Sequence, residues 1–206
     1  ELWLLTADPL VQLVEPFPTV TDALTAGIPV ARCEDGSTWR MRLVGSHVLV
    51  VGATGAGQGS VIWSVLAGLA DQIRAGLVQV WAVDPKGGME LAAGQPLFAR
   101  FCHGDSGQAA GYEAGFAAVL EDAVAVMRRR QDRLRGVTRL HTPSQGEPLI
   151  VVLVDELAAL TGWILDRTAK KRIETALGLL LSQGRAVGVV VVGAVLSPVL
   201  VPPPPV

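Results

Sequence analysis

The sequence contains few charged, aromatic and cysteine residues, and these shortages exclude several classes of protein. Only 17% of the 206 residues are charged, and the formal net charge is −2. A chain with this balance has no overall basic field, so any binding of nucleic acid must be local or must belong to an oligomer. The two cysteines, Cys33 and Cys102, are too few for a disulfide framework and suit a reducing cytoplasm. The three histidines show no metal-ligand spacing.

The sequence also lacks a recognisable signal peptide and a convincing membrane-spanning segment. Glu1 to Leu5 contain neither a basic region nor a long apolar core. The uncharged run 186–206 is interrupted by five prolines and two glycines. It therefore favours a buried strand over a spanning helix, which needs about 20 helix-compatible residues. Because the chain begins at Glu1 without a methionine, we interpret it as a fragment or a processed piece.

Apolar residues make up 50% of the sequence and fall in short runs that alternate with helical patterns. Runs of Val, Leu and Ala without charges are typical of parallel strands buried on both faces of a sheet. The alternation predicts an α/β fold, with a mostly parallel sheet and helices on both faces. The expected strands are 28–32, 38–43, 48–51, 77–83, 149–154 and 187–192, and the expected helices are 60–75, 108–135, 157–160 and 170–183. Residues 86–107 are expected to hold no regular element.

The same signals divide the chain into three parts. Residues 1–37 carry frequent turn signals and are expected to form an irregular N-terminal flank, with a strand near 28–32. Residues 38–198 contain the alternating strands and helices of the predicted nucleotide-binding domain. Residues 199–206 contain four consecutive prolines, which predict a polyproline II tail.

Residues 48–60, VLVVGATGAGQGS, contain the most informative motif in the chain. A buried strand runs into a glycine-rich turn, and an apolar segment with helix-like composition follows. Glycine lets the backbone approach a phosphate closely, and the helix N-terminus supplies oriented N–H donors. This context predicts a phosphate-binding loop made of Gly52, Ala53, Thr54, Gly55, Ala56, Gly57, Gln58, Gly59 and Ser60.

The loop departs from the pattern G-x-x-x-x-G-K-[ST] at two positions. Gln58 stands where the pattern has lysine, and Gly59 stands where it has the hydroxyl that binds Mg²⁺. Ser60 follows one residue late, about 100° further around a helix. Glutamine can donate a hydrogen bond but carries no charge to stabilise the transition state of phosphoryl transfer. We therefore expect ATP binding with weak or absent hydrolysis.

A second motif, LIVVLVDE at 149–156, places two carboxylates directly after a fully apolar strand. In a phosphoryl-transfer site the first acid, Asp155, would hold Mg²⁺ and the second, Glu156, would orient the attacking water. The alternative is that both acids only complement the dipole at a helix N-terminus. The glycine-rich loop about 100 residues upstream favours the catalytic interpretation.

Two basic features have alternative interpretations. Lys86 follows the expected strand 77–83, at the sheet edge where open α/β sheets bind ligands. It either approaches phosphates or a neighbouring subunit, or it is a solvated lysine in a turn. An arginine cluster near the end of the expected helix 108–135 either contacts phosphate or is a solvated helix end. The cluster consists of Arg128, Arg129, Arg130, Arg133 and Arg135.

Four segments together resemble the motor domain of the FtsK/SpoIIIE family, and its actinobacterial TraB-like branch in particular. The segments are GATGAGQGS, WAVDPKGGMEL, PLIVVLVDELAAL and LLLSQGRAVGVVVV, which occur in the family's order between about residues 38 and 195. The resemblance implies a RecA-like P-loop core that binds ATP and Mg²⁺, and a hexamer that translocates double-stranded DNA. It also implies a cytoplasmic domain, often tethered to the membrane through a region that this sequence does not contain.

Carried onto this sequence, the resemblance makes Gly52–Ser60 a degenerate Walker A motif and Asp155-Glu156 the Walker B motif. It makes Ser60 and Asp155 the metal-binding residues, and Arg185 a candidate contact to nucleotide at a subunit boundary, as Lys86 is. Leu196 departs from the family, which commonly places a polar glutamine near that position. The family core continues beyond the last expected strand, so the chain resembles a copy truncated at its C-terminus.

Three functions are consistent with these residues. The first is an ATP-binding translocase domain that hydrolyses ATP weakly or not at all, because Gln58 replaces the lysine of the loop. The second is a working translocase in which Lys86 or a neighbouring subunit supplies the missing lysine. The third is a non-catalytic assembly module, or pseudo-ATPase, that packs into oligomers with intact relatives.

Overall fold

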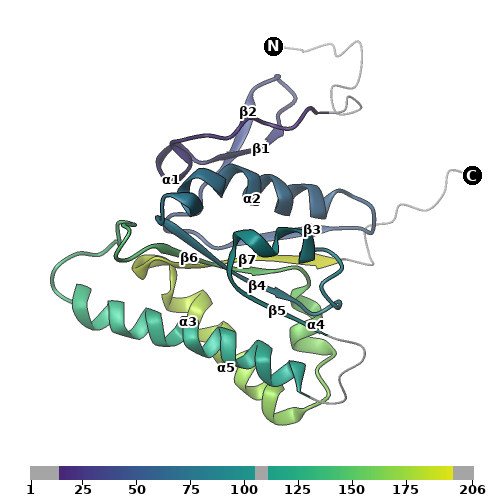
Figure 1. The fold of residues 1–206 in the computed structure, drawn as a ribbon, viewed down its shortest axis with the longest axis vertical. Helices are drawn as coiled ribbons and strands as arrows, with labels where there is room; N and C mark the ends of the chain where they lie inside the picture. Colours follow the sequence, from purple (N-terminus) through teal and green to yellow (C-terminus); the bar gives the residue numbers. More distant parts are fainter. Residues whose placement is uncertain (1–13, 105–110, 197–206) are drawn as a thin grey trace, which may run out of the picture.

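The computed structural model describes residues 14–104 and 111–196, which form a five-stranded sheet with helices on both faces (Figure 1). All neighbouring strands of this sheet are parallel, and their order is β3-β7-β6-β4-β5. The strands are β3 (Val48–Gly52), β4 (Val78–Asp84), β5 (Phe98–His103), β6 (Leu149–Val154) and β7 (Val189–Leu196). The predicted α/β fold is therefore confirmed.

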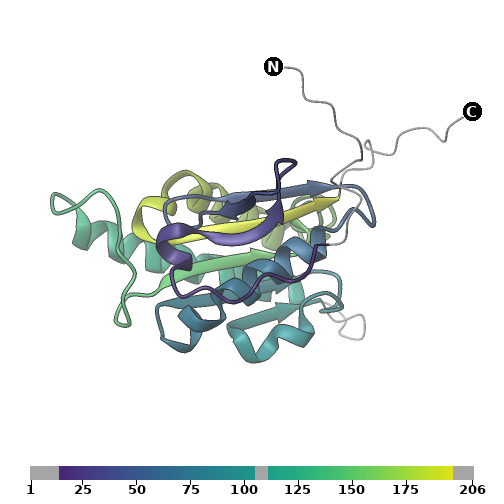
Figure 2. The ribbon, with the colours of Figure 1, turned by 90° about the horizontal axis from the view of Figure 1, so that it is seen from above.

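The sheet divides the hydrophobic core into two layers, and helices cover the layer on each face (Figures 1 and 2). One face is covered by α2 (Gln58–Arg74), and the other by α3 (Tyr112–Leu134) and α5 (Arg167–Gln183). Every residue of β6 is buried. Its side chains alternate, so that Leu149, Val151 and Leu153 pack toward α2 while Ile150, Val152 and Val154 pack toward α3 and α5.

The described part of the N-terminal flank, residues 14–37, packs against the outer side of α2. The short helix α1 (Ala23–Ala26) precedes β1 (Ile28–Arg32), which pairs antiparallel with β2 (Thr38–Met41) in a separate two-stranded sheet. The strand expected at 28–32 is therefore present, and its pairing crosses the expected boundary at residue 37. Gly68 of α2 allows this contact, because a Cβ atom there would collide with the side chain of Ile28.

The other elements agree with the sequence predictions except at one strand and several boundaries. Residues 86–107 hold the 3-10 helix η2 (Ala92–Leu97) and the edge strand β5, so the expectation of no regular element there is wrong. Strand β5 has no long apolar run because several of its side chains are exposed, including Arg100, which lies over the Trp81 ring. The chain continues through α4 (Leu157–Gly162), and η3 (Arg185–Val187) precedes β7. The predicted tail at 199–206 lies outside the described residues.

The arginine cluster at the end of α3 separates into residues with different surroundings. Arg130 is 5% exposed, and its guanidinium donates to the carbonyl oxygens of Pro148, Val187 and Gly188 at 2.6, 3.0 and 2.8 Å. Burial lowers the pKa of Arg130 from its ordinary value. Arg133 pairs with Glu147 and Arg135 with Asp132. The cluster is therefore not one phosphate-binding surface.

No helix among the described residues is both long enough and apolar enough to span a bilayer.

We predict that Arg130→Met lowers the free energy of unfolding by about 3 kcal/mol, because buried carbonyl groups lose a charged hydrogen-bond donor. Urea denaturation of the purified chain measures this change. The matched control is Arg128→Met, an exposed position on the same helix, where we expect a change within about 0.5 kcal/mol. Equal stability of the two variants would contradict a structural role for Arg130.

Candidate functional site

The topology of the sheet brings the glycine-rich loop, Lys86 and the two carboxylates to the end of the sheet where the parallel strands finish. Strands β3, β4 and β6 are parallel, so their carboxyl ends lie on the same side, where open α/β sheets bind ligands. Strand β7 lies between β3 and β6 and pairs with both. Its last residue, Leu196, is the partner of Gly52, the last residue of β3. The glycine-rich loop and the two carboxylates are therefore separated by a single strand.

The glycine-rich loop makes a tight turn between β3 and α2. Gly55 and Gly57 have φ angles of 78° and 90°, in the left-handed region that favours glycine. The Ala56 N–H donates to the Ala53 oxygen at 3.0 Å, and α2 begins at Gln58 directly after Gly57. The first N–H groups of a helix have no intrahelical acceptor. The loop therefore has the geometry of a phosphate-binding turn.

The two departures from the consensus loop have local structural explanations. The Gln58 Nε2 atom donates to the carbonyl oxygen of Val195 at 2.5 Å, so the side chain is bonded to the end of β7. A Cβ atom at Gly59 would collide with the carboxylate of Glu90. The end of the Glu90 side chain would therefore have to move if a hydroxyl residue stood at position 59. Ser60 is exposed and lines the cavity beside the loop.

The two carboxylates after β6 are withdrawn from water. The side chains of Asp155 and Glu156 are 8% and 1% exposed. Glu156 caps α4 by accepting the Ala158 N–H at 3.3 Å, and it also accepts the Leu196 N–H at 3.4 Å. Burial raises the pKa of Asp155 above its ordinary value, an effect that the charge of Lys86 opposes. Glu156 therefore caps α4, and its role in phosphoryl transfer stays a prediction.

Lys86 provides the counter-charge for both acids. Its Nζ atom lies 3.4 Å from Asp155 Oδ2 and 3.4 Å from Glu156 Oε2. Burial alone would lower the pKa of Lys86, but the charges of Asp155 and Glu156 outweigh that effect and raise it. Lys86 is therefore not a turn lysine surrounded only by solvent.

A network at Asp84 fixes the backbone around Lys86. Asp84 ends β4 and is fully buried, and its carboxylate accepts the N–H groups of Lys86, Glu90 and Leu91 at 3.0, 3.1 and 3.0 Å. The sequence indicated a turn here but gave no sign of this carboxylate's role. Glu90 was also missed, because it is distant in sequence from the loop that it contacts.

These groups surround one cavity of about 580 Å³, which is within the usual size range of small-molecule sites. Its walls carry loop residues, Lys86 and Asp155, whereas Glu156 is not among the residues that line it. Arg185 is in η3, before the start of β7, and therefore lies at the opposite end of that strand from the cavity. The lining residues are Thr54, Gly55, Gly57, Gln58, Gly59, Ser60, Trp63, Lys86, Glu90, Asp155 and Leu196.

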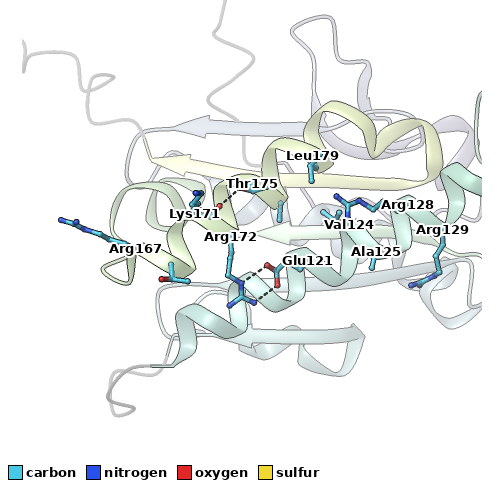
Figure 3. A pocket seen from close by; sticks show the side chains of 12 residues that line it. Glu121, Val124, Ala125, Arg128, Arg129, Arg167, Lys171, Arg172, Thr175 and Leu179 are labelled. Carbon is cyan, nitrogen blue, oxygen red and sulfur yellow. Dashed lines mark hydrogen bonds and ion pairs between the residues drawn. The ribbon is translucent and has the colours of Figure 1, made fainter.

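A larger cavity of about 840 Å³ lies between α3 and α5, on the other face of the sheet (Figure 3). It is lined by apolar side chains such as Val124 and Leu179, and by several basic ones. Arg172 and Glu121 form a two-point ion pair there, with bonds of 2.9 and 2.6 Å. This cavity has neither the glycine loop nor the buried acids, so the smaller one is the candidate site.

Comparisons with known proteins show the fold through solved structures. No family model matches, and no curated protein matches. The pCW3 conjugation coupling protein TcpA, in monomer form with ATPγS, has a TM-score of 0.65 and 20% identity. EssC (ATPases 2 and 3) from Geobacillus thermodenitrificans has a TM-score of 0.64 and a sequence identity of 16%. Thermomonospora curvata EccC (ATPases 2 and 3), in complex with a signal sequence peptide, has a TM-score of 0.61 and a sequence identity of 17%.

The matches cover most of this chain but only part of each neighbour. They cover 91%, 94% and 90% of this chain, and 53%, 38% and 32% of TcpA, EssC and EccC respectively. The chain thus spans about half of the first neighbour and less of the other two. These comparisons show that the chain shares the α/β fold of these three structures.

We predict that Asp84→Ala lowers the free energy of unfolding by about 3 kcal/mol, because three backbone N–H groups lose a charged acceptor. Urea denaturation provides the measurement. Asp122→Ala is the matched control, because it removes an exposed ion pair with Arg100 and should cost at most about 1 kcal/mol. A cost for Asp84→Ala no larger than the control would show that the network does not hold this turn.

Proposed function

We propose that the chain is the ATP-binding motor domain of an FtsK/SpoIIIE-type double-stranded DNA translocase, with impaired hydrolysis. One observation carries the proposal. The glycine loop, Lys86 and Asp155 come from three separate segments of the sequence and line a single cavity at the carboxyl edge of the sheet. The four motifs of the family occur in order along the chain, and the structural neighbours include a coupling protein with a bound ATP analogue.

The residues around the cavity fit a nucleotide with Mg²⁺. The buried Oδ2 atom of Asp155 accepts no hydrogen bond within the described part of the chain, and a metal there would replace its ionic contact with Lys86 Nζ at 3.4 Å. Asp155 and Ser60 would hold the metal, and the N–H groups of the loop would hold the phosphates. The metal, when bound, neutralises charge on the phosphate oxygens.

Two observations support impaired hydrolysis. Gln58 brings no charge to the phosphates, and its amide is already bonded to Val195. Glu156, which would orient the attacking water, is 1% exposed and accepts N–H groups from Ala158 and Leu196. A general base must reach a water molecule beside the γ-phosphate. Glu156 would have to leave these partners to do so.

The first experiment compares the parent chain with Gln58→Lys for ATP binding and turnover, each with and without duplex DNA. We expect the parent to bind ATP without measurable turnover. We expect Gln58→Lys to gain DNA-stimulated hydrolysis by at least about 10-fold, because a loop lysine adds charge-assisted bonds to the phosphates. Gln58→Lys combined with Glu156→Gln is the matched control, and it should lose the gained activity.

The possible results separate the candidate functions. Absence of ATP binding by both the parent and Gln58→Lys would overturn the proposal. DNA-stimulated turnover by the parent itself would overturn the impairment and favour the working translocase. Binding and turnover that ignore DNA would leave a nucleotide-binding domain whose partner is another molecule.

An assembly module that packs with intact translocase subunits is the second candidate function. The edge strand β3 favours it, because Leu49 and Val51 are 58% and 50% exposed there. Exposed apolar side chains beside a sheet edge are suited to contact with another chain. Association with an intact translocase that is independent of nucleotide, and weakened by Leu49→Asp, would support this function.

Under either function we propose a cytoplasmic domain that forms hexamers or mixed oligomers, with Arg185 at a subunit boundary.

A further inference from the structure

The glycine loop carries no lysine, but Lys86 brings a positive charge to the same cavity. We propose that Lys86 is the cation of the nucleotide site, which neutralises Asp155 and Glu156 in the arrangement described here and would bind the phosphates of a metal-nucleotide complex. This inference rests on the proposed function only in assuming that the loop binds a nucleoside triphosphate. It assigns to the turn after β4 a task that the consensus motif assigns to the loop.

The position of Lys86 allows both contacts. Strand β4 pairs with β6, with Val83 opposite Val154, so Lys86 and Asp155 extend from neighbouring strand ends. Lys86 also lines the cavity together with the loop residues Thr54 to Ser60. Among the described residues that line this cavity, Lys86 alone has a cationic side chain.

The backbone of Lys86 is fixed, whereas its side chain retains freedom. The carboxylate of Asp84 holds the Lys86 N–H at 3.0 Å, and Gly87 and Gly88 follow with φ angles of 78° and 80°. The Lys86 side chain is 37% exposed and has a flexible four-carbon stem. The ammonium group can therefore change partners while the turn remains in place.

The charges at the site provide a reason for the exchange. Two nearly buried carboxylates share one ammonium group, and a buried charge without a partner is strongly unfavourable. When a divalent cation is bound at Asp155, Lys86 is repelled from that carboxylate by a like charge. The phosphate oxygens at the loop then offer the ammonium group its new acceptors. Gln58 does not compete for this role, because it is neutral and bonded to Val195.

The test measures binding of a fluorescent, non-hydrolysable ATP analogue with Mg²⁺ by anisotropy, using the full chain. We expect Lys86→Met to weaken binding by about 10- to 100-fold, since charge-assisted bonds to phosphate are lost. Lys170→Met is the matched control, because Lys170 is an α5 residue that pairs with Glu174. We expect its binding to stay within about twofold of the parent.

A double variant distinguishes a phosphate ligand from a merely structural lysine. We expect Gln58→Lys with Lys86→Met to recover binding to within about threefold of the parent, because a loop lysine then supplies the charge. A lysine that only stabilised the turn would not be replaced from the loop.

A second readout is binding of Mn²⁺ without nucleotide, measured by electron paramagnetic resonance. Lys86→Met should bind Mn²⁺ more tightly than the parent, because no ammonium group competes for Asp155.

The outcomes separate this inference from the proposed function. If the parent binds the analogue and Lys86→Met binds it equally well, the inference is wrong and the nucleotide site stands. Failure of the double variant to recover binding also overturns the inference. If neither the parent nor Gln58→Lys binds the analogue, the proposed function fails first. Should Lys86→Met not fold, Lys86→Gln in the Glu156→Gln background makes the same comparison with one carboxylate charge fewer.

Discussion

Burial of two carboxylates at the end of β6 is the constraint on which the site depends. Removing a charge from water costs several kcal/mol unless a partner compensates it, and Asp155 and Glu156 are both nearly inaccessible. The compensation comes from Lys86, which the neighbouring strand β4 delivers. Asp84 in turn fixes the backbone of Lys86 through hydrogen bonds to three N–H groups. The acids, the lysine and the turn therefore form one interdependent unit.

The end of β7 connects this unit to the glycine loop. The Val195 carbonyl oxygen accepts the amide of Gln58, and the Leu196 N–H donates to Glu156. Two successive residues of one strand thus restrain the atypical loop residue and the second carboxylate. Through these two hydrogen bonds, a change at Gln58 can alter the position of Glu156, which is about 100 residues away in the sequence.

Sequence patterns predicted the strands with continuous apolar runs, including the edge strand β3, but they missed the edge strand β5. Strand β6 was predicted at its observed bounds because six consecutive apolar residues are buried on both faces. Strand β5 was missed because it lies at the edge and several of its side chains are exposed, including Arg100. Arg130 was grouped with solvated arginines because its neighbours Arg128 and Arg129 are also basic. Arg130 donates to the carbonyl groups of Val187, Gly188 and Pro148, which lie just before β7 and β6, and no local pattern reveals these contacts.

The sequence by itself determined the α/β fold, the glycine loop, the paired acids and the absence of a lysine at position 58. Each of these features depends on a short-range pattern of apolar residues, glycines or charges, which can be recognised within one short stretch of the sequence. Only the tertiary structure decided that Lys86 reaches the acids, that Glu90 faces Gly59 and that Gln58 bonds to Val195. The physical reason is that these contacts join the ends of different strands, and strand order is set by packing of the whole sheet.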